Sequence, residues 1–87
     1  SRPSIDLSFI TAAQTYHRKL VGIILSGANK DGAQGLKKIK DSGGAAIVQD
    51  PKECDVATMS QAALDITEVD HIYQTDQIVN FLLKLKS

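Results

Sequence analysis

Apolar positions along the chain follow two spacings in turn, one typical of helices and one typical of buried strands. Positions 5, 9, 12, 13 and 16 are apolar at the 3.6-residue period of a helix, with Ser4 as its N-cap. The next run, LVGIIL over 20–25, is apolar without a break, which is typical of a strand covered on both faces of a parallel sheet. The pattern therefore predicts a first helix over 4–16 and then a buried strand.

The remainder of the chain repeats this alternation. A helix over 31–41 has an apolar face formed by Ala33, Leu36 and Ile39, and Gly43-Gly44 ends it as a C-cap. Further along come a short buried strand over 45–48, a loop over 51–58, a short helix over 60–66, a weaker strand over 69–73 and a last helix capped by Thr75 or Asp76. The predicted order is α-β-α-β-α-β-α.

Helices that alternate with strands in this way indicate an α/β fold. The expected architecture is a doubly wound parallel sheet with helices on both faces, joined by right-handed crossovers. Three strands make a small sheet, and the first of them is apolar on both faces. We therefore expect at least one edge of this sheet to pair with a segment outside this sequence.

Composition and charge exclude several classes of partner. The 87 residues carry 10 Lys and Arg against 10 Asp and Glu, so the formal net charge is zero. This balance argues against general affinity for nucleic acid or an anionic membrane, and the lack of Trp argues against a base-stacking platform. No apolar run approaches the ~20 residues of a membrane span, so we expect neither nucleic-acid binding nor membrane insertion.

Residues that bind metals or form disulfides are few and scattered. Cys54 is the only cysteine, which excludes an internal disulfide and fits a reducing cytoplasm. Its neighbours Glu53 and Asp55 are acidic, which makes the thiol a poor nucleophile. His17 and His71 have no acid partners at ligand spacing, and we expect a surface position for the first and a structural hydrogen bond for the second. The sequence therefore predicts no metal and no cofactor.

The stretch SGANKDGAQG over 26–35 follows the first buried strand, at the kind of strand end where α/β sheets bind ligands. Gly27 and Gly32 have the glycine spacing of a phosphate-binding loop. Ala33-Gln34, however, stands where that loop needs Lys and then Ser or Thr. The chain also contains no G-x-S-x-G nucleophile motif. A nucleotide site and a nucleophile within this chain are therefore both disfavoured.

Asp31 lies inside this stretch and has two interpretations. With Gln34 three residues later it resembles a capping box, and an acid at a helix start interacts favourably with the helix dipole. Alternatively, Asp31 is an acid that orients a catalytic histidine, as in Ser-His-Asp triads. Composition does not choose between a structural and a catalytic carboxylate.

Short motifs occur in a fixed order along the chain. They are Pro3-Ser4-Ile5-Asp6, Val21-Gly22-Ile23-Ile24-Leu25-Ser26-Gly27, Asp31-Gly32-Ala33 with Gly35-Leu36, Gly43-Gly44, Gln49-Asp50-Pro51, Met59 with Ala62-Ala63-Leu64, and Val69-Asp70-His71. Together they resemble the catalytic domain of the chemotaxis protein-glutamate methylesterases, the CheB family, and the resemblance covers nearly all of the chain.

The resemblance implies a function and a site. Members of that family hydrolyse γ-glutamyl methyl esters on the cytoplasmic helices of chemoreceptors, and many also deamidate receptor glutamines. They carry a Ser-His-Asp triad on a doubly wound α/β sheet, and Asp31 is at the position that matches the triad acid. The family's serine and histidine lie upstream of the part matched here. Residues 1–87 then correspond to the C-terminal portion of the catalytic domain and are expected to be inactive alone.

The same resemblance implies a cytoplasmic location and a set of partners. These are the cytoplasmic helices of methyl-accepting chemoreceptors, the rest of the catalytic domain and, as in many family members, a receiver domain. No cofactor is implied, since the triad chemistry needs none.

Two departures from the family pattern favour an alternative function. Ser26-Gly27-Ala28-Asn29 stands where the family usually has Thr-Gly-Met-Gly, and Ser60 stands where a proline usually follows Met59. Since the family's methionine borders the active site, Ala28 changes the wall of the substrate pocket. The alternative is a non-catalytic α/β module, degenerate relative to the family, that only binds a partner.

Overall fold

The computed structural model describes residues 9–13, 20–28 and 30–85, and the predicted alternation of helix and strand is confirmed from residue 20 onward. Its elements are β1 (Phe9–Ala13), β2 (Leu20–Ile24), α1 (Asp31–Asp41), β3 (Ala45–Gln49), the 3-10 turn η1 (Pro51–Glu53), α2 (Thr58–Ile66), β4 (His71–Tyr73) and α3 (Thr75–Leu85). Helix α1 begins and ends at the predicted residues, whereas β4 is shorter than expected.

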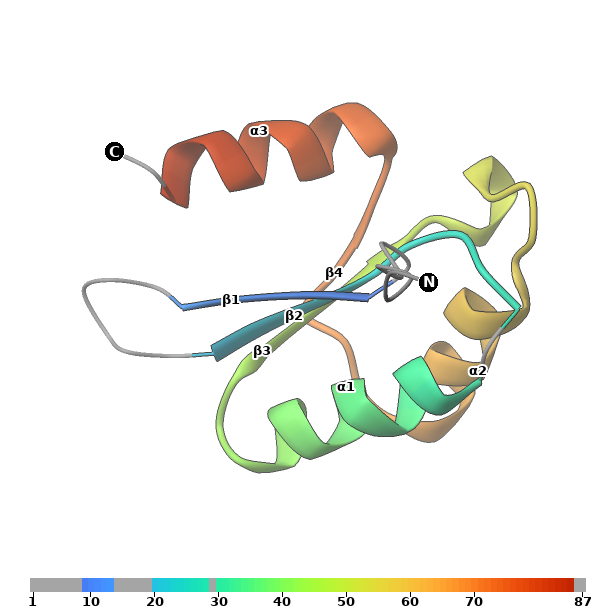
Figure 1. The fold of residues 1–87 in the computed structure, drawn as a ribbon, viewed down its shortest axis with the longest axis horizontal. Coiled ribbons are helices and arrows are strands. Elements are labelled where there is room, and N and C mark those ends of the chain that lie inside the picture. The colour runs from blue at the N-terminus through green and yellow to red at the C-terminus, as the bar shows by residue number, and fades with distance from the viewer. Residues whose placement is uncertain (1–8, 14–19, 29, 86–87) are drawn as a thin grey trace, which may run out of the picture.

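The strands form one sheet in the order β1-β2-β3-β4. Strands β2, β3 and β4 are parallel, with Val21 opposite Ala45 and Ile47 opposite His71, and β1 runs antiparallel to β2. Helices α1 and α2 cover one face of the sheet and α3 covers the other (Figure 1). The predicted α/β class with helices on both faces of a parallel sheet is therefore confirmed, with an antiparallel strand added at one edge.

The predicted helix over 4–16 is wrong where the structure describes it, because Phe9–Ala13 form strand β1. Positions 4–8 and 14–16 lie outside the described residues. An unpaired edge of β2 presents a row of backbone N–H and C=O groups, and satisfying them outweighs a helical period in a short segment. The register places Phe9 opposite Ile24 and Ala13 opposite Leu20. Strand β1, a segment of this sequence, thus covers one edge of β2. The expectation that at least one edge of the sheet pairs with a segment outside this sequence stays a prediction.

Alternating side chains of β2 and β3 point to opposite faces of the sheet and build two apolar clusters. The cluster against α1 and α2 contains Ile24, Ala33, Leu36, Ala46, Val48, Met59 and Ala63. The cluster against α3 contains Val21, Ile23, Ile47 and Ile78. Because each fully buried aliphatic side chain contributes about 1.5–3 kcal/mol relative to an exposed one, these clusters hold the helices on the sheet.

Helix α1 ends at a glycine pair, as predicted. Gly43 has a φ of 96°, a left-handed conformation that glycine adopts without a steric penalty. Its N–H donates to the Lys40 carbonyl at 3.1 Å, and the Gly44 N–H donates to the Ile39 carbonyl at 2.9 Å, which is the Schellman pattern. This arrangement turns the chain directly from α1 into β3.

At the start of α1, Gly32 allows close approach to α2. A Cβ atom at Gly32 would overlap the sulfur of Met59 and lie 3.3 Å from Cδ1 of Ile24. Both of those side chains are buried in the cluster beneath α1 and α2. The first turn of α1, which includes Asp31, is therefore held against α2 by a position that has no space for a side chain.

The variant Gly32→Ala is expected to lower the free energy of unfolding by about 1–3 kcal/mol, because the added methyl displaces Met59 or α1. Without that overlap, Ala would instead favour the helix by about 1 kcal/mol. Urea unfolding of the two proteins measures the difference. In a Met59→Ala background the same substitution should cost little, because the space is then available. An equal cost in both backgrounds would contradict the role of Met59.

Candidate functional site

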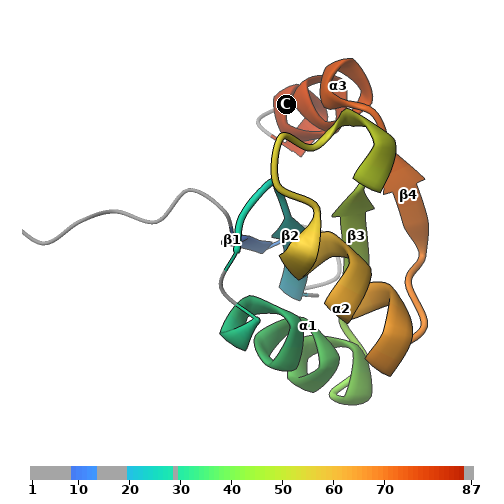
Figure 2. The same ribbon diagram turned by 90° about the vertical axis from the view of Figure 1, so that its right-hand side faces the viewer.

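The loops that follow β2, β3 and β4 meet at the carboxyl edge of the sheet. The loops after β2 and β3 gather at the right-hand side of Figure 1, which faces the viewer in Figure 2. The Asp50 N–H donates to the Tyr73 carbonyl at 2.8 Å, which joins the ends of β3 and β4. This is the edge at which parallel α/β sheets bind their ligands.

Backbone and hydroxyl contacts attach the loop after β2 to the loop after β3. The Ser26 hydroxyl accepts from the Val56 N–H at 3.0 Å and donates to the Val56 carbonyl at 3.2 Å. The Gly27 N–H also donates to that carbonyl, at 2.9 Å, and the Gly27 carbonyl accepts from the Met59 N–H at 3.0 Å. Since both hydrogen-bonding roles of the Ser26 hydroxyl are filled by backbone, Ser26 has a structural role and not that of a nucleophile.

A side-chain network from β3 holds the other side of the same loop. Gln49, at the end of β3, is 8% exposed, and its Oε1 accepts from the Ser26 N–H at 2.9 Å. Its Nε2 donates to the Thr75 hydroxyl at 3.0 Å, and that hydroxyl donates to Glu53 Oε1 at 2.8 Å. The network therefore joins the loops after all three parallel strands.

The same network contributes the cap of α3. Helix α3 begins at Thr75, whose N–H donates to Glu53 Oε1 at 2.7 Å, and the Gln74 N–H donates to Gln77 Oε1 at 2.8 Å. The predicted cap from Thr75 or Asp76 is therefore corrected: Thr75 is the first helical residue. A carboxylate brought from η1 accepts its orphan N–H, which local sequence does not reveal.

Asp31 is the first residue of α1 and is exposed at this carboxyl edge. Lys30 occupies the N-cap position, and its side chain makes no capping hydrogen bond. The predicted capping box of Asp31 and Gln34 is therefore wrong, because Asp31 lies one position inside the helix. The expected favourable placement of an acid in the first turn, near the positive end of the helix dipole, is confirmed.

The remaining sequence candidates have packing or surface roles. Of the two glycines with phosphate-loop spacing, Gly32 packs against Met59, and Gly27 makes backbone hydrogen bonds to Val56 and Met59. Cys54 is half-buried, with its Sγ 3.5 Å from the Asp50 carbonyl oxygen and 3.4 Å from the Ser60 hydroxyl. These contacts agree with a bystander thiol.

The two histidines do not form a site in the described part of the chain. His71 is exposed and stacks on Tyr73, with ring centroids 4.7 Å apart and planes at 11°, in place of the expected structural hydrogen bond. His17 lies outside the described residues. Among the residues that the structure describes, no group of three or more His, Cys, Asp or Glu side chains is placed to hold a metal ion.

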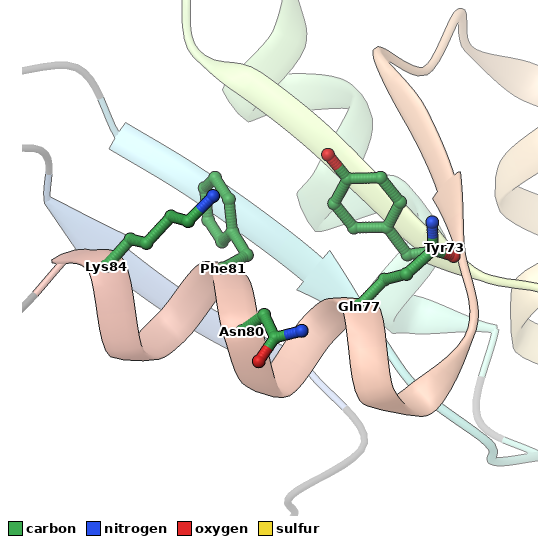
Figure 3. Close-up of a pocket in the computed structure, with 5 residues that line it drawn as sticks. All are labelled: Tyr73, Gln77, Asn80, Phe81 and Lys84. Carbon is green, nitrogen blue, oxygen red and sulfur yellow. The ribbon is translucent and has the colours of Figure 1, made fainter.

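A shallow hollow of about 240 Å³ lies beside α3, away from Asp31. Its lining residues come from β4 and α3 and are Tyr73, Gln77, Asn80, Phe81 and Lys84 (Figure 3). The Tyr73 and Phe81 rings are tilted at 57° with centroids 6.4 Å apart, and both pack against the cluster under α3. None of its lining residues is acidic, so the hollow adds no candidate carboxylate.

Comparison with known proteins identifies the family of the chain. The family model described as CheB methylesterase matches residues 1–82. The chain belongs to the CheB methylesterase family. The carboxyl edge that carries Asp31 is thus the corresponding edge of a CheB-type domain, and the resemblance noted in the sequence motifs is confirmed.

Individual relatives support the assignment. A protein of Leptospira interrogans serogroup Icterohaemorrhagiae serovar copenhageni (strain Fiocruz L1-130) is 51% identical over 85 residues, which cover 98% of this chain and 44% of the relative. A protein of Anaeromyxobacter dehalogenans (strain 2CP-C) is 39% identical, over 97% of this chain and 25% of its own length. A protein of Pyrococcus horikoshii (strain ATCC 700860) is also 39% identical, over 95% of this chain and 23% of its own length.

The names of these relatives describe two reactions. The Anaeromyxobacter and Pyrococcus proteins are named protein-glutamate methylesterase/protein-glutamine glutaminase, and the Leptospira protein carries the same name in provisional form. The chain spans less than half the length of each of them.

In the described residues, no helix has the length and apolar character needed to cross a membrane.

Sequence reasoning did not find the network centred on Gln49. The segment Gln49-Asp50-Pro51 contributed to the family resemblance but carried no assigned role. The available signal was a polar residue at the end of an apolar strand, since a buried amide requires hydrogen-bond partners. Its partners, Ser26 and Thr75, lie far from it in sequence. The sequence therefore indicates that Gln49 requires hydrogen-bond partners but does not indicate which residues they are.

Asp70 lies at the opposite edge of the sheet, where the parallel strands β3 and β4 begin. Its Oδ2 accepts from the Ala46 N–H at 2.7 Å, and its Oδ1 lies 3.0 Å from Lys40 Nζ. Burial raises the pKa of Asp70, but the hydrogen bond from Ala46 and the ammonium of Lys40 outweigh it and hold the pKa below its ordinary value. The charged carboxylate thus stabilises the junction between β3 and β4.

The variant Asp70→Asn is expected to lower the free energy of unfolding at pH 7 by about 1 kcal/mol. Because the pKa of Asp70 is lower in the folded state, its stabilisation is present above about pH 4, the unfolded value, and is lost as pH falls through the folded value. Urea unfolding at a series of pH values should therefore show the two proteins converging in acid.

The matched control is Asp41→Asn, which removes a carboxylate whose ion pair among the described residues is with the partly exposed Lys37. Such an i,i+4 pair contributes about 0.3–0.5 kcal/mol, so its loss should have a small effect. A difference between wild type and Asp70→Asn that stays constant down to pH 2 would contradict the role of the Asp70 charge.

Proposed function

We propose that this chain is the C-terminal portion of a protein-glutamate methylesterase domain, and that Asp31 is the acid of its Ser-His-Asp triad. The observation that carries the proposal is the position of Asp31 within a CheB-family chain. It is exposed at the start of α1, directly after the loop that leaves β2, at the edge where ligands bind. An exposed carboxylate at that edge is within reach of an imidazole from another segment.

The chemistry assigns Asp31 a supporting role. A serine oxygen attacks the carbonyl carbon of a γ-glutamyl methyl ester, and a histidine accepts the serine proton and passes it to the departing methanol. Water then attacks the acyl-enzyme, and the serine leaves as the glutamate carboxylate forms. Throughout, the acid accepts a hydrogen bond from the imidazole, which fixes its tautomer and stabilises the imidazolium. With an amide substrate the departing group is ammonia.

The serine and the histidine of this proposal lie outside the 87 residues. The substrate is the methylated cytoplasmic helix of a chemoreceptor, and the other partners are the rest of the catalytic domain and a receiver domain. The reaction uses no metal and no cofactor, and it takes place in the cytoplasm. The names of the relatives support both the esterase and the glutaminase activities.

A partner-binding module without catalysis is the second candidate. Ala28 favours it, because this residue is exposed at the carboxyl edge where the family usually has methionine. The sequence upstream of this chain discriminates between the two functions. A G-x-S-x-G motif after a strand supports the esterase, and its absence supports the binding module.

In the full-length protein, Asp31→Asn is expected to reduce methanol release from methylated receptor by about 10⁴-fold, because the amide favours the wrong imidazole tautomer. The matched control is Asp65→Asn, an exposed carboxylate on α2 that accepts from Gln61. It should leave the rate unchanged. The 87-residue chain alone should release no methanol, since it lacks the nucleophile. Equal rates of methanol release in Asp31→Asn and wild type would contradict the role of Asp31 as the triad acid.

A further inference from the structure

We infer that Gln49 is a positioning residue of the esterase site, which acts by holding the Ser26 N–H and with it the loop that leads to Asp31. The inference rests on the proposed function. Among the described residues, the Gln49 side chain hydrogen-bonds to Ser26 and Thr75 and not to Asp31. Its effect is transmitted through the chain between the end of β2 and the start of α1.

The hydrogen-bonding roles in the network have one possible direction. A backbone N–H can only donate, so the amide oxygen of Gln49 must face Ser26. The amide nitrogen therefore faces Thr75 and donates to its hydroxyl. The single proton of that hydroxyl goes to Glu53, whose carboxylate can only accept. Each group thus has a defined partner, and the amide of Gln49 has one orientation.

Burial makes this orientation stable. Gln49 is 8% exposed, so its amide has little access to water that could replace either partner. Its backbone is also fixed, because Gln49 is the last residue of β3 and lies opposite Tyr73 in β4. A rigid strand therefore presents the amide oxygen to Ser26.

The loop after β2 is held from two directions, and Gln49 supplies one of them. Val56 and Met59 bind Ser26 and Gly27 from the loop after β3 and the start of α2. Gln49 binds Ser26 from the end of β3, and Gln49 is itself held by Thr75 at the start of α3. Without Gln49, the loop keeps only the first set of contacts and can shift about it. A displacement of about 1 Å at a catalytic group reduces the rate by as much as 10²-fold.

Neither of the near-isosteric replacements reproduces both contacts. Methionine has the length of glutamine but neither an acceptor for Ser26 nor a donor for Thr75. Glutamate keeps an acceptor for the Ser26 N–H but has no proton for Thr75 when ionised, so the Thr75 hydroxyl must choose between two carboxylates. These two variants therefore separate the contact with Ser26 from the contact with Thr75.

The experiment compares Gln49→Met, Gln49→Glu and Gln61→Met in the full-length protein. Gln61→Met is the matched control, since it makes the same change at an exposed position of α2. Two quantities are measured for each: kcat and KM for methanol release from methylated receptor, and the hydrogen-exchange rate of the Ser26 amide. The exchange rate reports the hydrogen bond to Gln49 directly and does not depend on activity.

In Gln49→Met we expect kcat to fall by about 10- to 100-fold with KM nearly unchanged, and Ser26 amide exchange to accelerate by about tenfold. Gln49→Glu keeps the acceptor for Ser26 but places a second carboxylate beside Glu53, so its exchange rate and kcat should lie between those of wild type and Gln49→Met. This partial rescue excludes a loss caused by general unfolding. Gln61→Met should match wild type in both measurements.

Four results would overturn the inference. One is an active wild type in which Gln49→Met has the same kcat as Gln61→Met, which leaves the proposed function intact. Another is a fall in kcat without faster exchange at Ser26, or an equal fall in Gln49→Glu. A wild-type protein that releases no methanol would overturn the proposed function and, with it, any role of Gln49 in catalysis, whatever the exchange rates show.

Discussion

The parallel pairing of β2 with β3 governs the arrangement of the other elements, because neither face of this pair is accessible to water. Val21, Ile23, Ile24, Ile47 and Val48 are at most 1% exposed. A sheet that is apolar on both faces requires a layer of helices on each, and α1 with α2 on one face and α3 on the other supply these layers. Parallel pairing also places the exits of β2 and β3 at the same edge, so the chain between a strand and its helix must cross that edge.

Polar groups at that edge compensate for the apolar interior. Where β2 ends, the backbone of Ser26 and Gly27 finds partners in Val56, Met59 and Gln49. The position of this loop is therefore determined by contacts from a neighbouring loop, the start of α2 and the end of β3 rather than by its own sequence. An acid placed at its far end, as Asp31 is, acquires a defined position from the scaffold. Binding groups on loops that a rigid sheet supports are the usual means by which α/β folds carry function.

Local pattern predicted the elements whose stability is local. Helix α1 was predicted in full, because its apolar period and the glycine pair after it are contained in one segment. The helix over 4–16 failed because pairing with β2, a distant segment, decides the conformation of Phe9–Ala13. The predicted cap of α3 failed for the same reason, since a carboxylate from η1 satisfies Thr75. The capping box of α1 failed locally, because the helix begins with Asp31 and not after it. The position of Asp31 at the carboxyl edge followed from chain order, whereas the partners of Gln49 required the fold.

The two departures from the family pattern differ in what they change. Ser60 is fully buried, and its hydroxyl lies 3.4 Å from Cys54 Sγ, so this departure is satisfied within the packing. It alters the interior next to Met59 and has no direct contact with solvent. Ala28, in contrast, is exposed at the carboxyl edge, where a shorter side chain removes contact area from whatever binds there. The backbone at Ser26 and Gly27 is held by contacts that do not involve the side chain at position 28. The departure at Ala28 therefore changes the exposed surface of the carboxyl edge and leaves the hydrogen bonds of Ser26 and Gly27 to other residues.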